Sequence, residues 1–123
     1  MIDHIGIAVS DFDRAVAFYT KALAPLGYVH IMTFGTHAGF GIDGKPDFWI
    51  EGGKQPKDRI HVAIRAKGRA DVRAFYEAAI AAGGKDNGAP GVREHYHANY
   101  YGAFVLDPDG HNVEAVCHDA YLG

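Results

Sequence analysis

Cysteine is almost absent from this 123-residue sequence, which contains Cys117 alone. A single cysteine excludes an intrachain disulfide and any metal cluster built on several thiolates. Positive charge is also scarce, because 12 Lys and Arg face 15 Asp and Glu, a formal net charge of −3 at pH 7. Without a basic stripe, neither nucleic acid nor an acidic membrane surface is an expected partner.

Long apolar runs are missing as well. No stretch approaches the roughly 20 apolar residues that a membrane-spanning helix needs. The beginning, Met1-Ile2-Asp3-His4, carries a charge and runs directly into a strand pattern, which is not the pattern of a signal peptide. These features predict a soluble, cytoplasmic protein that forms one domain over residues 1–123 and binds small molecules.

An internal repeat is the strongest pattern that the sequence does contain. Placing His61 on His4 aligns, without a gap, apolar and glycine positions in the two halves. The aligned pairs are Ile7 with Ile64, Phe18 with Phe75, Tyr19 with Tyr76, Ala22 with Ala79, and Gly27 with Gly84. A repeat of this length indicates that one structural unit occurs twice.

Each half predicts a strand, a helix and three further strands. Residues 2–9 alternate as a strand does, and helical spacing then continues to Gly27, with Ser10 and Asp13 as a capping-box-like start. Three strand-like runs follow, and the second half repeats the order. The predicted fold class is α+β, with two tandem βαβββ modules at about residues 1–52 and 59–119 whose curved mixed sheets enclose a cleft.

The last strands meet at a predictable turn. Asp107-Pro108-Asp109-Gly110 reads as a tight turn, because Pro108 presets φ and Gly110 accepts a positive φ. The flanking runs, 100–106 and 112–117, therefore form a hairpin. Glu114 lies in the middle of its second strand, either on a solvated face or beside a partner that holds its charge.

Four residues with the chemistry of metal ligands lie on repeated elements. His4 and His61 occupy equivalent first strands, and Glu51 and Glu114 lie on the last strands of the two halves. Two imidazoles with one or two carboxylates suit a divalent Zn, Ni, Fe, Mn or Co ion. Taken singly, each histidine is more often a hydrogen-bonded structural residue, so the hypothesis depends on their coincidence in the repeat.

The sequence resembles the vicinal-oxygen-chelate superfamily, which includes glyoxalase I, bleomycin and fosfomycin resistance proteins, and extradiol dioxygenases. The motifs that carry the resemblance are the stretch from Ile2 to Val9, Ala17-Phe18-Tyr19, His61-Val62-Ala63-Ile64 with Phe75-Tyr76, and the stretch from Asp107 to Glu114. The resemblance implies paired βαβββ modules with a metal held at His4, His61 and Glu114. Glyoxalase I adds a carboxylate that Glu51 matches, but it has an Arg for glutathione where this chain has Ala8, which counts against a glutathione hemithioacetal substrate.

Two classes of function follow. The first is a metal-dependent enzyme of the glyoxalase or dioxygenase type, a lyase, isomerase or oxygenase whose substrate chelates the ion through adjacent oxygens. Glu114, His97 and Tyr101 are its candidate catalytic residues, since the stretch from Glu94 to Tyr101 is dense in groups that transfer protons. The alternative is a non-catalytic protein of the bleomycin-resistance type.

That alternative sequesters an aromatic ligand by stacking, for which Trp49 and Tyr100 are the candidate residues. A third possibility is an enzyme that has kept the ligand residues and binds no physiological substrate. In each case a homodimer is expected, because two small open sheets leave edges and apolar patches that symmetric association covers.

Overall fold

The computed structural model describes residues 1–119, which form two four-stranded sheets with one α-helix each. The first module contains β1 (Ile5–Ala8), α1 (Phe12–Leu23), a 3₁₀ turn (Ala24–Leu26), β2 (Val29–Phe34), β3 (His37–Ile42) and β4 (Lys45–Glu51). The second contains β5 (His61–Arg65), α2 (Arg69–Ala81), β6 (Lys85–Val92), β7 (Tyr101–Leu106) and β8 (Asn112–Cys117). The predicted α+β fold of two βαβββ modules is confirmed.

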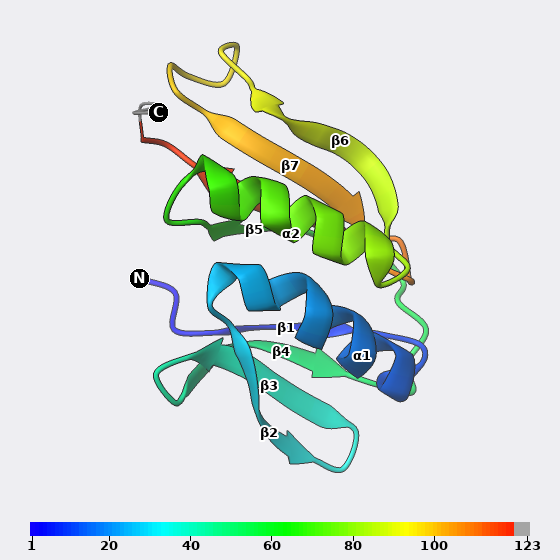
Figure 1. Cartoon of the computed structure of the whole chain (residues 1–123). Helices are drawn as coiled ribbons and strands as arrows, with labels where there is room; N and C mark the ends of the chain where they lie inside the picture. The colour runs from blue at the N-terminus through cyan, green and yellow to red at the C-terminus, as the bar shows by residue number, and fades with distance from the viewer. Residues whose placement is uncertain (120–123) are drawn as a thin grey trace.

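The two sheets have the same topology. Their strand orders are β1-β4-β3-β2 and β5-β8-β7-β6, and the first pair in each is parallel while the other pairs are antiparallel. Figure 1 shows α1 and α2 side by side on one side of the molecule, with β1 and β5 facing each other behind them. The sheets remain separate ladders, so within residues 1–119 they do not close around the predicted cleft.

The N-cap of helix α1 lies one residue later than predicted. Asp11 is the N-cap, and its side chain accepts a hydrogen bond from the Arg14 N–H at 3.0 Å. Ser10 instead binds Asp109 in the second module, as described below. The helix ends through a 3₁₀ turn at Gly27, whose φ of 85° is one that glycine adopts without strain. No helix within residues 1–119 has the length and apolar character to cross a membrane.

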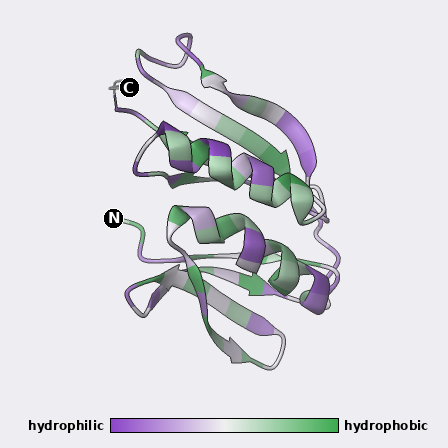
Figure 2. Cartoon of the chain, viewed as in Figure 1, coloured by the Kyte–Doolittle hydropathy of each residue, from purple (hydrophilic) through white to green (hydrophobic). Residues whose placement is uncertain are grey.

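The core lies between the helices and the sheets. Alternate residues of the strands face it, so Phe48 and Ile50 in β4 and Val113 and Ala115 in β8 are buried in one hydrophobic cluster that includes both modules. In Figure 2 the hydrophobic end of β7 contrasts with the hydrophilic start of β6 at the outer edge. The other alternate residues of the same strands, including Trp49 and Glu51 in β4 and Glu114 in β8, point to the sheet face that lacks a helix, called here the open face.

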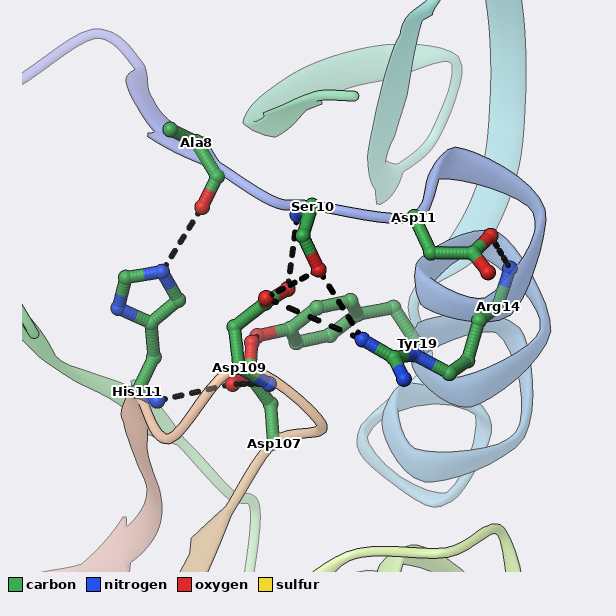
Figure 3. Close-up of polar contacts among 8 residues, drawn as sticks. All are labelled: Ala8, Ser10, Asp11, Arg14, Tyr19, Asp107, Asp109 and His111. Carbon is green, nitrogen blue, oxygen red and sulfur yellow. Dashed lines mark hydrogen bonds and ion pairs between the residues drawn. The ribbon is translucent and has the colours of Figure 1, made fainter. Parts of the chain in front are cut away.

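The turn between β7 and β8 joins the modules (Figure 3). Asp107 is 4% exposed, and one of its oxygens accepts hydrogen bonds from the N–H groups of Asp109 and His111 at 2.9 and 2.8 Å. Its other oxygen accepts from the hydroxyl of Tyr19 in α1 at 2.6 Å. Gly110 closes the turn with a φ of 90° and a hydrogen bond from its N–H to the Asp107 carbonyl, which confirms the predicted turn.

Asp109 and His111 of the same turn also form hydrogen bonds with the first module. Asp109 accepts hydrogen bonds from both the N–H and the hydroxyl of Ser10, at 3.1 and 2.6 Å. His111 is 1% exposed, and its Nε2 lies 2.8 Å from the Ala8 carbonyl while its Nδ1 accepts from the Ile60 N–H at 3.1 Å. A turn of the second module therefore fixes the end of β1 and the start of α1 in the first.

Candidate functional site

Glu114 is the centre of the candidate site, because it is a carboxylate with 0% exposed surface on the open face. The His61 ring nitrogen Nε2 lies 2.7 Å from its Oε1, and the Tyr100 hydroxyl donates to its Oε2. Gly102 leaves the space for this group, since a Cβ there would lie 3.3 Å from Oε2. Of the two alternatives for Glu114, the structure supports a paired carboxylate rather than a solvated one.

Tyr100 keeps its proton in this environment. Burial raises its pKa above the ordinary value, and the hydrogen bond to Glu114 and the charge of that carboxylate raise it further. The phenol is therefore a donor at neutral pH. His61, by contrast, leaves 53% of its side chain exposed, so the Glu114 pair opens to solvent through the imidazole.

Strand register places Trp49, and not Glu51, at the position equivalent to Glu114. Glu114 lies opposite Ala63, two residues after His61, whereas Trp49 lies opposite Gly6, two residues after His4. The expected match between the last strands of the two halves was therefore wrong by two residues.

Glu51 does lie on the open face, but farther along the strand, opposite Ala8. Its Oε1 is 2.8 Å from Lys54 Nζ and 3.5 Å from His37 Nε2. The hydrogen bond from Lys54 lowers the pKa of the Glu51 carboxyl, with smaller contributions from the positive charges. The ligand role of Glu51 stays a prediction.

Trp49 forms a flat aromatic surface on the first module. Glycines occupy the two neighbouring strands beside it, Gly6 on β1 and Gly39 on β3. The indole lies across Gly39, where a Cβ would approach it to 2.9 Å. Phe34, which is 64% exposed, stacks beside it with ring centres 6.3 Å apart and an angle of 16°. Phe34 was not predicted from the sequence, because only the pairing of β2 with β3 brings it to Trp49.

Tyr101 and His97, the two other predicted catalytic residues, form no hydrogen bond with Glu114 in the described part of the chain. Tyr101 faces the helix side, where the Arg69 guanidinium lies 4.9 Å from its ring centre and Arg73 Nη1 donates to its hydroxyl at 3.4 Å. His97 lies in the exposed loop before β7, and its ring meets that of Tyr100 edge-on with centres 5.3 Å apart. The structure thus brings Tyr100 to the carboxylate, and the catalytic roles of Tyr101 and His97 stay predictions.

A groove of about 400 Å³ lies where the two modules meet. Its lining includes His61 from β5 and, from the first module, Asp3 and Ile5. These are the sequence neighbours of His4, which lies one residue before β1 rather than within it. The His4 ring is exposed and its Nδ1 contacts Asp3 Oδ1 at 2.7 Å.

The donor set fits a divalent ion in part. An imidazole nitrogen and a carboxylate oxygen are ligands that such ions accept, and His61 with Glu114 offers one of each. Within the described part of the chain, no three His, Cys, Asp or Glu side chains lie close enough to hold an ion. The structure therefore brings His61 to Glu114 and does not bring His4 or Glu51 to them.

The fold and the open faces define a protein of the duplicated βαβββ class. The model of the Glyoxalase/Bleomycin resistance protein/Dioxygenase superfamily matches residues 1–115, and the chain belongs to this family. No curated protein matches the sequence.

Solved structures share the fold. A glyoxalase/bleomycin resistance protein from Albidiferax ferrireducens T118 is 24% identical with a TM-score of 0.81, over 94% of this chain and 97% of that one. A glyoxalase/bleomycin resistance protein/dioxygenase family enzyme from Burkholderia phytofirmans PsJN is 19% identical with a TM-score of 0.74, over 96% and 98%. A glyoxalase-related enzyme from Fulvimarina pelagi is 18% identical with a TM-score of 0.70, over 95% and 87%.

Proposed function

We propose that this protein is a metal-dependent enzyme of the glyoxalase or dioxygenase type, acting on a small molecule that chelates a divalent ion through adjacent oxygens. His4, His61 and Glu114 would hold the ion, which would be Zn, Ni, Fe, Mn or Co. The observation that carries the proposal is the fully buried Glu114 carboxylate paired with His61 on the open face. A buried carboxylate costs free energy unless a cation or several donors compensate it, and a bound ion would add its charge to the compensation that His61 and Tyr100 already supply.

The remaining donor of the proposed set, His4, belongs to the first module. His4 adjoins the residues that line the groove beside His61, and its exposed ring is held only by the neighbouring Asp3. Rotation of this side chain away from Asp3 exchanges one surface contact, which contributes little to stability. Glu51 would be a fourth ligand only if the end of β4 moved towards the pair.

The chemistry would then divide between the ion and two side chains. When bound, the ion would act as a Lewis acid that stabilises negative charge developing on the substrate oxygens. Tyr100 keeps its proton and can donate a hydrogen bond to negative charge on a substrate oxygen beside Glu114. Glu114 can take a proton from the substrate, and His97 beside Tyr100 can exchange protons with solvent.

Metal analysis of purified protein tests the proposal. We expect about one divalent ion per site, and His61→Ala should weaken its binding by about 10-fold or more, because a ligand is lost. His37→Ala is the matched control, since His37 is also a half-exposed strand histidine beside a glutamate but lies outside the proposed set. Full retention of the ion in His61→Ala would reject His61 as a ligand.

The stacked Trp49 and Phe34 favour a second candidate function, a binding protein that sequesters an aromatic molecule without a metal. Trp49 is the only tryptophan of the chain, so its fluorescence reports directly on this surface. Saturable quenching by an aromatic ligand that is unchanged by a chelator would favour sequestration. Quenching that requires added metal would favour the enzyme.

A further inference from the structure

Arg93, which follows β6, extends its guanidinium over the open face of the second module. Its Nη1 donates to the carbonyls of Gly91 and Gly102 at 2.7 and 3.1 Å, and its Nη2 donates to the carbonyl of Ala89 at 2.9 Å. Its Cζ lies 5.3 Å from the ring centre of Phe104. Phe104 is the cross-strand partner of Glu114, so the guanidinium lies on the same face as the candidate site.

The backbone around Arg93 is shaped to receive the guanidinium. The pairing of β6 with β7 shifts register between Asp86 and Gly88 and again between Gly88 and Gly91. Added Cβ atoms at Gly88 and Gly91 would each lie 3.1 Å from a guanidinium nitrogen. These irregularities let carbonyl groups turn towards the side chain, so the arginine is held in place before any ligand arrives.

The charge and part of the donor capacity of Arg93 remain available. Over residues 1–119 no carboxylate forms an ion pair with it, and its three partners are neutral carbonyls. A guanidinium carries five N–H donors, so about two are left after the three hydrogen bonds. Glu114, which lies on the open face of the second module, is already bound by His61 and Tyr100.

We infer that Arg93 binds a carboxylate of the ligand, so that the molecule taken up by the open face is an anion. A carboxylate presents two oxygens in one plane, which match two remaining donors of a preorganised guanidinium. The inference rests on the proposed function only in placing a small molecule on this face, and it needs no metal. A role limited to fastening β6 to β7 is the rival explanation.

Benzoate and its neutral analogue benzamide are suitable probes, used on the whole metal-free protein. Titration with benzoate should shift the Nε–H resonance of Arg93 in ¹⁵N–¹H spectra and saturate, whereas benzamide should not. Calorimetry should give a preference for benzoate over benzamide that falls by about 10-fold or more in Arg93→Gln, because the charge-assisted pair is lost. Arg93→Lys, which keeps the charge without the planar fork, should retain part of it.

Arg59→Gln is the matched control, since Arg59 is an exposed arginine beside Gly110, at the end of the β7–β8 hairpin opposite to Arg93. It should keep the preference for benzoate. Equal affinity of the wild-type protein for both probes would overturn the inference. So would an Arg93→Gln variant that loses stability but keeps the preference, because Arg93 would then only fasten the strands.

The design also separates this inference from the proposed function. If Arg93→Gln fails to fold, the Arg93 resonance in the wild-type protein and the Arg93→Lys affinities still decide the inference. Preference for benzoate together with failure to bind any of Zn²⁺, Ni²⁺, Fe²⁺, Mn²⁺ and Co²⁺ would reject the metal-dependent function alone. Binding of one of these ions without preference for benzoate would reject the role of Arg93 alone.

Discussion

Tyr19→Phe should destabilise the protein through one buried hydrogen bond. Tyr19 has 0% exposed surface, and its hydroxyl donates at 2.6 Å to an oxygen of Asp107, which is 4% exposed. The substitution keeps the ring, which packs against Phe18 and Phe48 with centres 4.9 and 5.0 Å away, so it creates little cavity. What it removes is the only side-chain donor to that carboxylate oxygen among residues 1–119.

A hydrogen bond to a charged group contributes about 1.5–3 kcal/mol, and an unsatisfied buried oxygen keeps its desolvation penalty. We therefore expect the free energy of unfolding to fall by about 2–3 kcal/mol, a large part of the roughly 5–15 kcal/mol of a typical domain. Urea unfolding followed by circular dichroism measures this as a lower midpoint at unchanged slope.

Tyr28→Phe is the control, because the Tyr28 hydroxyl binds Asp47 at 3.0 Å in an exposed position. That variant should lose less than about 1 kcal/mol, since water replaces the lost partner. Equal losses in the two variants, or a Tyr19→Phe loss below about 0.5 kcal/mol, would refute the view that the Asp107 turn fastens the modules.

Three further predictions follow from the described contacts. Burial and the Asp107 charge raise the pKa of Tyr19 well above its ordinary value, so the folded state keeps a proton that the unfolded state loses above about pH 10. Stability should therefore fall as pH rises beyond about 10, by about 1.4 kcal/mol per pH unit from this residue, and urea midpoints of Tyr19→Phe should lack that part of the slope. Glu51→Gln should leave the metal–chelator competition curve within about 2-fold, because Glu51 pairs with Lys54 and His37, and a 10-fold loss would establish it as a fourth ligand. Light scattering should give about twice the chain mass of 13.3 kDa, since Phe34 and Val29 leave exposed apolar surface on edge strand β2, and a monomer mass would contradict the dimer.

The sequence by itself determined the duplicated architecture. The gapless alignment of His61 on His4, the alternation in the strands and the Asp107 to Gly110 turn are local patterns, and local patterns are visible without a structure. The same patterns identified Glu114 as an unusual strand residue. They could not show that its partner is Tyr100 rather than Tyr101, because a shift of one residue changes the face of the sheet.

Only the tertiary structure decided the contents of the site. The parallel register of β1 with β4 placed Trp49 where Glu51 was expected, because register depends on pairing between strands far apart in the sequence. Ser10, expected to cap its own helix, binds Asp109 instead, for the same reason. The role of Arg93 could not be predicted from the sequence. Its partners are backbone carbonyls, which approach the guanidinium where β6 shifts register against β7. Residue types and repeats follow from the order of the chain, whereas a carbonyl or carboxylate acquires its partner only when distant segments pack together.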